Sequence, residues 1–198
     1  MNTVELVRFS LSLAFEYLDQ AVSDVTQEQA DWLPAGKANS IGALYWHTIA
    51  YVDQLVHDWC MPPFKDVSVE EVFEAKRAKR ELGMGQVALR HRDGWQEKVV
   101  RAFPPENPED PYWDVRAARE GIQVDLPALH DYAHATVQTL LDWAASLTPE
   151  DLERVIPTPF GDYNQGQWLE FFIIWHINVH CGEIAALKGC QGLTGYPW

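Results

Sequence analysis

The sequence lacks most features of secreted, membrane-bound or nucleic-acid-binding proteins. Its 198 residues include three cysteines without a Cys-x-x-Cys pair, which is typical of a reducing cytoplasm and argues against a disulfide framework. Only 15 residues are basic against 29 acidic ones, and a net charge of -14 disfavours binding to nucleic acid or to an anionic membrane. The apolar run at 168–175 is too short to span a bilayer, and the first nine residues carry no signal-peptide pattern. We therefore expect a cytoplasmic protein with neither kind of partner.

Alternation of apolar and polar residues, the mark of a half-buried strand, is also missing. Apolar residues instead recur at helical spacing over 3–24, 40–60, 125–147 and 165–188. Four helices of this length indicate an all-α four-helix bundle. A chain that is 47% hydrophobic can fill one sizeable core, so we expect a single domain over residues 1–198.

Residues 61–124 are expected to form a helical insert between the second and third bundle helices. The pattern Ser68-x-x-Glu71 predicts the start of a charged helix that continues to Lys79 or Leu82, and a second helical stretch over 86–103 is interrupted by Gly94. The insert carries more aromatic residues than a solvated linker needs. We expect part of it to cover the functional site or a homodimer interface, the alternative being an extra layer that only thickens the core. These residues are Phe64, Phe73, Trp95, Phe103, Tyr112 and Trp113.

The most informative feature is a pair of histidines, His176 and His180, which lie four residues apart in the last predicted helix. This spacing places both imidazoles on one face, among apolar side chains. Buried polar groups need partners, and a metal ion can satisfy two imidazoles at once. A third ligand must come from another helix, and His47, at the edge of the apolar stripe of 40–60, is the best candidate.

A second pair, His130 and His134, has the same spacing and encloses Asp131. It resembles a zinc-protease helix motif in which aspartate replaces glutamate. We interpret this pair as a polar flank of its helix, with a metal site as the alternative. Asp131 and His134 form one acid-x-x-His pattern. A carboxylate-bridged di-iron centre would need a second such pattern, which the sequence lacks.

Other residues are candidates for the surroundings of the site. Glu183 falls on the histidine face, where it could orient a ligand imidazole, act as a catalytic base toward bound water, or simply face solvent. Tyr51 and Gln54 are predicted to lie near His47 and to line the pocket. Cys181 points about 100° away from His180 and is interpreted as a core residue.

Two segments resemble the signature segments of the DinB-like superfamily, a family of helical bundles that includes many metal-dependent enzymes. The resemblance covers 1–60 and 125–198 but not the insert, and Glu183 stands where glutamine is frequent. It implies one metal ligand on the second helix and two on the fourth, which correspond to His47, His176 and His180. The segments are Ser40-Ile41-Gly42-x-Leu44-x-Trp46-His47 and His176-x-x-x-His180-x-Gly182-Glu183-Ile184.

Three imidazoles make zinc the default divalent metal ion, with nickel, iron and manganese as alternatives. Such a site could activate water for hydrolysis or bind a low-molecular-weight thiol for transfer to another small molecule. The resemblance supports both reactions, because relatives include thiol transferases and a mycothiol-dependent isomerase. The alternative is a bundle without catalytic activity, in which the metal is structural and the protein is a binding or stress-response module.

Overall fold

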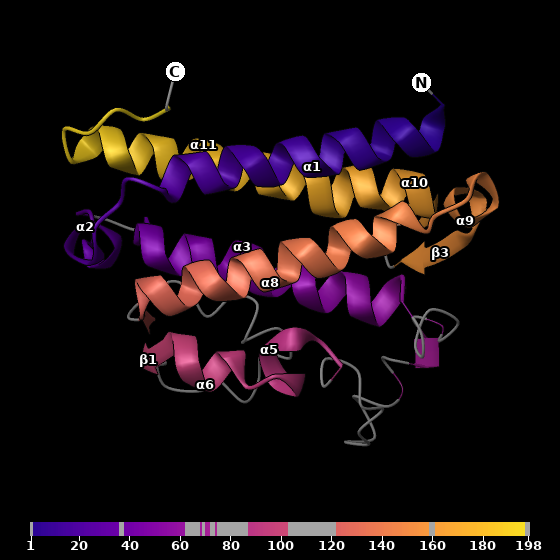
Figure 1. The fold of residues 1–198 in the computed structure, drawn as a ribbon, viewed down its shortest axis with the longest axis horizontal. Helices are drawn as coiled ribbons and strands as arrows, with labels where there is room; N and C mark the ends of the chain where they lie inside the picture. The colour runs from indigo at the N-terminus through magenta and orange to yellow at the C-terminus, as the bar shows by residue number, and fades with distance from the viewer. Residues whose placement is uncertain are drawn as a thin grey trace.

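Long helices packed side by side form the body of the molecule, as Figure 1 shows. The computed structural model describes residues 2–35, 38–61, 68, 70–71, 74, 87–102, 122–158 and 161–196. The bundle consists of α1 (Thr3–Val22), α3 (Ile41–Trp59), α8 (Leu126–Ala145) and a last helix assembled from three segments. α1 packs against α8 and α11, and α3 packs against the same two helices. The predicted all-α bundle is confirmed.

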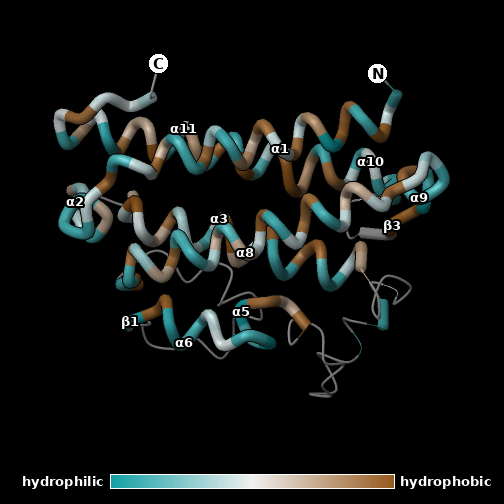
Figure 2. Tube along the Cα trace, viewed as in Figure 1, coloured by the Kyte–Doolittle hydropathy of each residue, from teal (hydrophilic) through white to brown (hydrophobic). Residues whose placement is uncertain are grey.

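Capping side chains explain where the long helices begin. Asn2 accepts a hydrogen bond from the Glu5 amide and starts α1. Ser40 caps α3 and Asp125 caps α8 in the same way. Each cap satisfies amide groups that have no partner within the helix. Between the caps, brown and teal positions alternate along the helices in Figure 2, because one face of each is apolar.

The fourth bundle helix changes its geometry immediately before the predicted metal ligands. It starts as α10 (Gln165–Trp168), continues as the π-helix η1 (Leu169–Ile174), and returns to α geometry in α11 (Trp175–Cys190). The amide of Trp175 donates to the carbonyl of Glu170, five residues earlier. π-Helical segments within α-helices are often found at functional sites. The sequence predicted one uninterrupted α-helix here.

The start of α3 is held in close packing with the short helix α2 (Gln27–Asp31) and the strand β2 (Gln123–Val124). A Cβ atom added to Gly42 would lie 2.9 Å from Cγ2 of Val124 and 3.2 Å from the carbonyl oxygen of Ala30. No other residue fits this position without displacing its neighbours, which explains glycine in the segment that leads to His47.

Two small antiparallel ribbons accompany the helices, and the sequence did not predict them. β1 (Val100–Ala102) pairs with β2, and β3 (Val155–Thr158) pairs with β4 (Gly161–Asn164). β3 follows another short helix, α9 (Pro149–Glu153). Strands of two to four residues are too short to show an alternating pattern, so these ribbons had no readable signal.

The described part of the insert forms a layer below α3 and α8 in Figure 1. Gly94, with φ of 67°, separates α5 (Leu89–Arg92) from α6 (Trp95–Val99), so the predicted interruption is confirmed, but the helix ends before 103. Ser68 and Glu71 form the predicted capping contacts. The rest of the expected helix to Lys79 or Leu82 lies outside the described residues.

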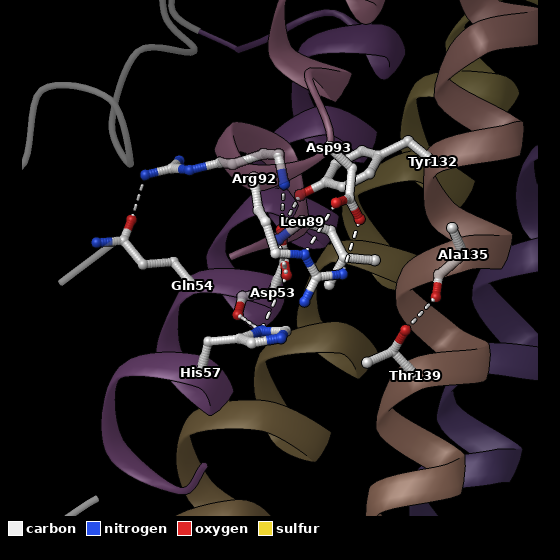
Figure 3. Close-up of polar contacts among 10 residues, drawn as sticks. Asp53, Gln54, His57, Leu89, Arg92, Asp93, Tyr132, Ala135 and Thr139 are labelled. Atoms are coloured by element: carbon white, nitrogen blue, oxygen red, sulfur yellow. Dashed lines mark hydrogen bonds and ion pairs between the residues drawn. The ribbon is translucent and has the colours of Figure 1, made fainter. Parts of the chain in front are cut away.

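A buried carboxylate attaches α5 to the bundle. Asp53 on α3 accepts hydrogen bonds from the amides of Leu89 and Arg90 at 3.0 and 2.9 Å, and from the hydroxyl of Tyr132 on α8 at 2.7 Å. His57 lies one turn further along α3, with Nδ1 3.1 Å from the same carboxylate. Figure 3 shows these groups converging on Asp53. The carboxylate thus takes the role of an N-terminal cap for a helix that has none of its own.

Of the six aromatic residues singled out in the insert, only Trp95 belongs to the described residues, and the other five lie outside them. Trp95 packs against Tyr132 of α8, with ring centroids 5.9 Å apart. For this residue the structure matches the alternative of an extra layer on the bundle.

Within the described chain, we find no helix whose length and hydropathy would allow it to span a bilayer.

Candidate metal centre

The structure brings His47, His176 and His180 together at the seam between α3 and α11. Nε2 of His176 lies 3.3 Å from Nε2 of His47 and 3.1 Å from Nε2 of His180. Each histidine offers one ring nitrogen, and these three nitrogens all lie within 4.8 Å of one another. In the described part of the chain, this is the one group of side chains arranged to hold a metal ion. Residues 129 positions apart in the sequence therefore meet as predicted.

The spacing of the nitrogens fits a metal ion. Zinc binds imidazole nitrogens at 2.0–2.1 Å, and tetrahedral angles then separate two ligand nitrogens by about 3.3–3.4 Å. The two Nε2 separations, 3.1 and 3.3 Å, lie close to this value. Without an ion, three ring nitrogens that face one another cannot all find a hydrogen-bond donor or acceptor. The cluster is compatible with a divalent ion, and the nitrogen spacing does not select one metal.

The His176 imidazole is kept neutral. Burial, followed by the nearby His180 and His47 rings, lowers the pKa of His176 to about 2. A neutral imidazole is the form that binds metal. Its Nδ1 is buried and has no hydrogen-bond partner among the described residues.

Tyr51 fixes the plane of the same ring from α3. Its ring stacks on His176 with centroids 4.1 Å apart and planes 24° from parallel, and it lies 5.7 Å from the His47 ring. Burial raises the pKa of Tyr51, so the phenol keeps its proton. The expectation that Tyr51 lies near His47 is confirmed by these contacts.

Glu183 contacts the cluster from its outer side. Its Oε2 lies 2.6 Å from Nδ1 of His180, while half of the Glu183 side chain remains exposed to solvent. A carboxylate beside Nδ1 favours the tautomer with the proton on that nitrogen, which leaves the Nε2 lone pair directed toward the other histidines. This geometry places Glu183 behind a candidate ligand, whereas its expected role as a base toward bound water stays a prediction.

The competing pair in α8 does not form a cluster. His130 lies with Nδ1 3.4 Å from the hydroxyl of Tyr45 on α3, whereas His134 lies with Nε2 3.1 Å from Oδ1 of Asp19 on α1. The two histidines thus have partners on different helices. The interpretation of this pair as a polar flank agrees with these contacts.

Two other candidates, Gln54 and Cys181, have different surroundings. Gln54 accepts a hydrogen bond from the guanidinium group of Arg90, so its amide is engaged with the insert. Cys181 is buried, and burial raises the pKa of its thiol to about 12. A thiol that stays protonated at neutral pH is a poor metal ligand. Cys181 is therefore a core residue, as the sequence indicated.

With this geometry established, comparison with known proteins identifies the family. The family model described as the DinB superfamily matches residues 10–184. The chain belongs to the DinB superfamily. The matched range runs through residues 61–124, which the two signature segments do not include. No curated protein matches the chain.

Two solved structures share the DinB-like fold. A conserved protein from Enterococcus faecalis is 19% identical with a TM-score of 0.62, and the alignment covers 95% of this chain and 96% of that one. The colibactin self-resistance protein ClbS, solved in complex with a double-stranded DNA, is 13% identical with a TM-score of 0.50 and coverages of 96% and 95%. At these identities the likeness concerns the fold alone.

Proposed function

We propose that this DinB superfamily protein is a metal-dependent enzyme acting on a small molecule, with one divalent ion bound by His47, His176 and His180. The observation that carries the proposal is the approach of three imidazole nitrogens from two helices to within 4.8 Å. Zinc is the default ion, and nickel, iron and manganese would suit the same ligands. We treat residues 1–198 as one domain, since the described insert packs on α3 and α8.

The residues around the cluster would have different roles in binding the ion. Three neutral imidazoles leave the charge of the ion intact, so it would lower the pKa of a bound water or thiol. Glu183 would hold His180 in the ligating tautomer, and the Tyr51 ring would keep His176 in plane. Glu183 is then a positioning residue. Its half-exposed carboxylate could also accept a proton from a reacting group, which is the catalytic role that the sequence suggested.

Two reaction classes suit such a site, namely hydrolysis by water and transfer of a low-molecular-weight thiol. The alternative is a metal bound for structural reasons in a stress-response or binding module. Addition of cysteine to cobalt-substituted protein separates these cases. A thiolate-to-cobalt absorption band would favour thiol transfer, whereas turnover of activated esters or amides without thiol would favour hydrolysis. A spectrum that no added ligand changes would refute catalysis at this centre.

We propose a cytoplasmic location and no nucleic-acid partner for this chain. All three cysteines are free, as a reducing compartment allows. The DNA in the ClbS complex belongs to that protein, and a chain with a net charge of -14 repels phosphate groups. Fluorescence anisotropy with a labelled duplex at physiological salt should show no binding below about 100 μM, the weak end of non-specific affinities.

Metal content tests the central proposal. Protein purified without chelators or a nickel column should contain one divalent ion per chain, and His176→Ala should remove it. His134→Ala is the matched control, because His134 is exposed and contacts Asp19 instead of the cluster. If His176→Ala keeps full metal occupancy, or if His134→Ala loses it equally, the ligand assignment is wrong.

A further inference from the structure

A groove lies between α1 and α8, with α3 as its floor. Its volume is about 350 Å³, within the range of small-molecule sites. The side chains that line it are mostly apolar and come from all three helices. They include Phe15 and Leu18 of α1, Ile49 of α3, and Ala133, Val137 and Leu141 of α8.

The groove carries two acidic residues at its rim. Glu16 and Asp19 stand one helical turn apart on α1, and Ser12 and His134 complete the rim. Among the residues that the structure describes, those lining the groove include no lysine or arginine. The carboxylate of Asp19 faces Nε2 of His134 at 3.1 Å, across the opening between the two helices. A positively charged group would therefore be attracted to this rim, and an anion would be repelled.

Tyr45 adds a buried polar group to the apolar floor. It is 1% exposed, and its hydroxyl lies 3.4 Å from Nδ1 of His130. Burial, with the nearby charge of Asp19, raises the pKa of Tyr45, so the phenol remains neutral. The floor thus presents one uncharged hydroxyl between apolar walls, and the negative charge is confined to the rim.

The groove is separate from the histidine cluster. Tyr45 and Ile49 are one turn apart on one face of α3, whereas His47 and Tyr51 occupy the other face. Two residues along an α-helix correspond to a rotation of about 200°, so Tyr45 and His47 point in nearly opposite directions. A ligand in the groove would not touch the three imidazoles.

We propose that the α1–α8 groove is a second binding site, for a small organic cation with an apolar body, such as an arylalkyl or alkyl ammonium ion. The apolar part packs against Phe15, Ile49 and Val137, and the ammonium group lies between the carboxylates of Glu16 and Asp19. On binding, it takes the place of His134 beside Asp19. The proposal does not depend on the metal or on catalysis.

Ammonium binding can be measured by NMR on the whole chain with 15N labelling. The probe is 2-phenylethylammonium, with neutral 2-phenylethanol and anionic phenylacetate as analogues of similar size. We expect saturable shifts at the amides of Ala133 and Val137. Exposed carboxylates contribute modestly to the free energy of binding a cation, so the ammonium ion should bind about fivefold more tightly than the alcohol. Phenylacetate should bind more weakly than either.

Two variants separate charge from apolar contact. The double variant Glu16→Gln/Asp19→Asn should reduce ammonium affinity to that of the alcohol, whereas Asp142→Asn, an exposed acid on α8 outside the groove, should leave it unchanged. Val137→Phe, at a half-buried position, should fill the groove and weaken ammonium and alcohol alike. Equal affinities of the unmodified protein for ammonium and alcohol, or a Glu16→Gln/Asp19→Asn protein that still prefers ammonium, would overturn the proposal. Loss of binding on treatment with a chelator would assign the probe to the metal centre and overturn it as well.

Discussion

Replacement of Asp53 by asparagine should be among the most destabilising single changes in this chain. The Asp53 carboxylate is fully buried and receives two backbone amides, one phenol and the His57 ring. The amide group of asparagine would turn a hydrogen-bond donor toward one pair of these donors. Breaking a buried charged network by removing one partner costs about 3–5 kcal/mol. For a chain of this size, that loss corresponds to a fall in Tm of about 6–20 °C.

Thermal unfolding monitored by circular dichroism measures this loss, and hydrogen exchange at the amides of Leu89 and Arg90 locates it. The matched control is Asp93→Asn in the same segment, where the Asp93–Arg92 pair is 40% and 52% exposed and should contribute less than about 1 kcal/mol. Metal content should not change in either variant. A fall in Tm below about 3 °C for Asp53→Asn, or unchanged exchange at the two amides, would refute the account of this network.

Three further predictions concern other parts of the chain. Burial alone would lower the pKa of His57, but contact with the Asp53 carboxylate outweighs burial, and the net effect is a raised pKa. The protonated His57 ring therefore stabilises the fold fully below about pH 6.5, and this stabilisation is lost as pH rises through the higher pKa of the folded state. Urea titrations of metal-free protein should show this decline, and His57→Gln should abolish it. Tyr51→Leu should weaken metal binding about tenfold because the stack on His176 is lost, whereas Tyr51→Phe should retain it, as measured by competition with a chromophoric chelator. Gly42→Ala should cost about 1–3 kcal/mol through overpacking, while Gly189→Ala, with no atom within 4 Å of the new methyl group, should not lower Tm.

The long helices could be predicted because the sequence of each contains more than one helix signal. Periodic apolar positions and a capping residue define α1, α3 and α8 to within about two residues. The three histidines could be predicted because the spacing of His176 and His180 fixes their direction on one helix. His47 was the best third candidate from its place at the edge of an apolar stripe, and the family resemblance supported that choice. Spacing within a helix alone says nothing about which helix lies opposite.

Other features had no signal in the sequence. The hydrogen bonds to Asp53 join positions 36, 37 and 79 residues apart, and an aspartate within an apolar stripe does not reveal its donors. The groove between α1 and α8 arises from a gap in packing among side chains that each look like ordinary core or surface residues. Both depend on tertiary distances, which local pattern cannot supply.

The π-helix η1 has a consequence for changes in chain length. A π-helical turn holds about one residue more than an α-helical turn. Deletion of one residue within Leu169–Ile174 would therefore let the segment relax to α geometry, while α11 keeps its position against α3. The same deletion between His176 and His180 would swing one imidazole about 100° away from the other. Length variation in this helix should thus be tolerated immediately before the metal centre and excluded within it.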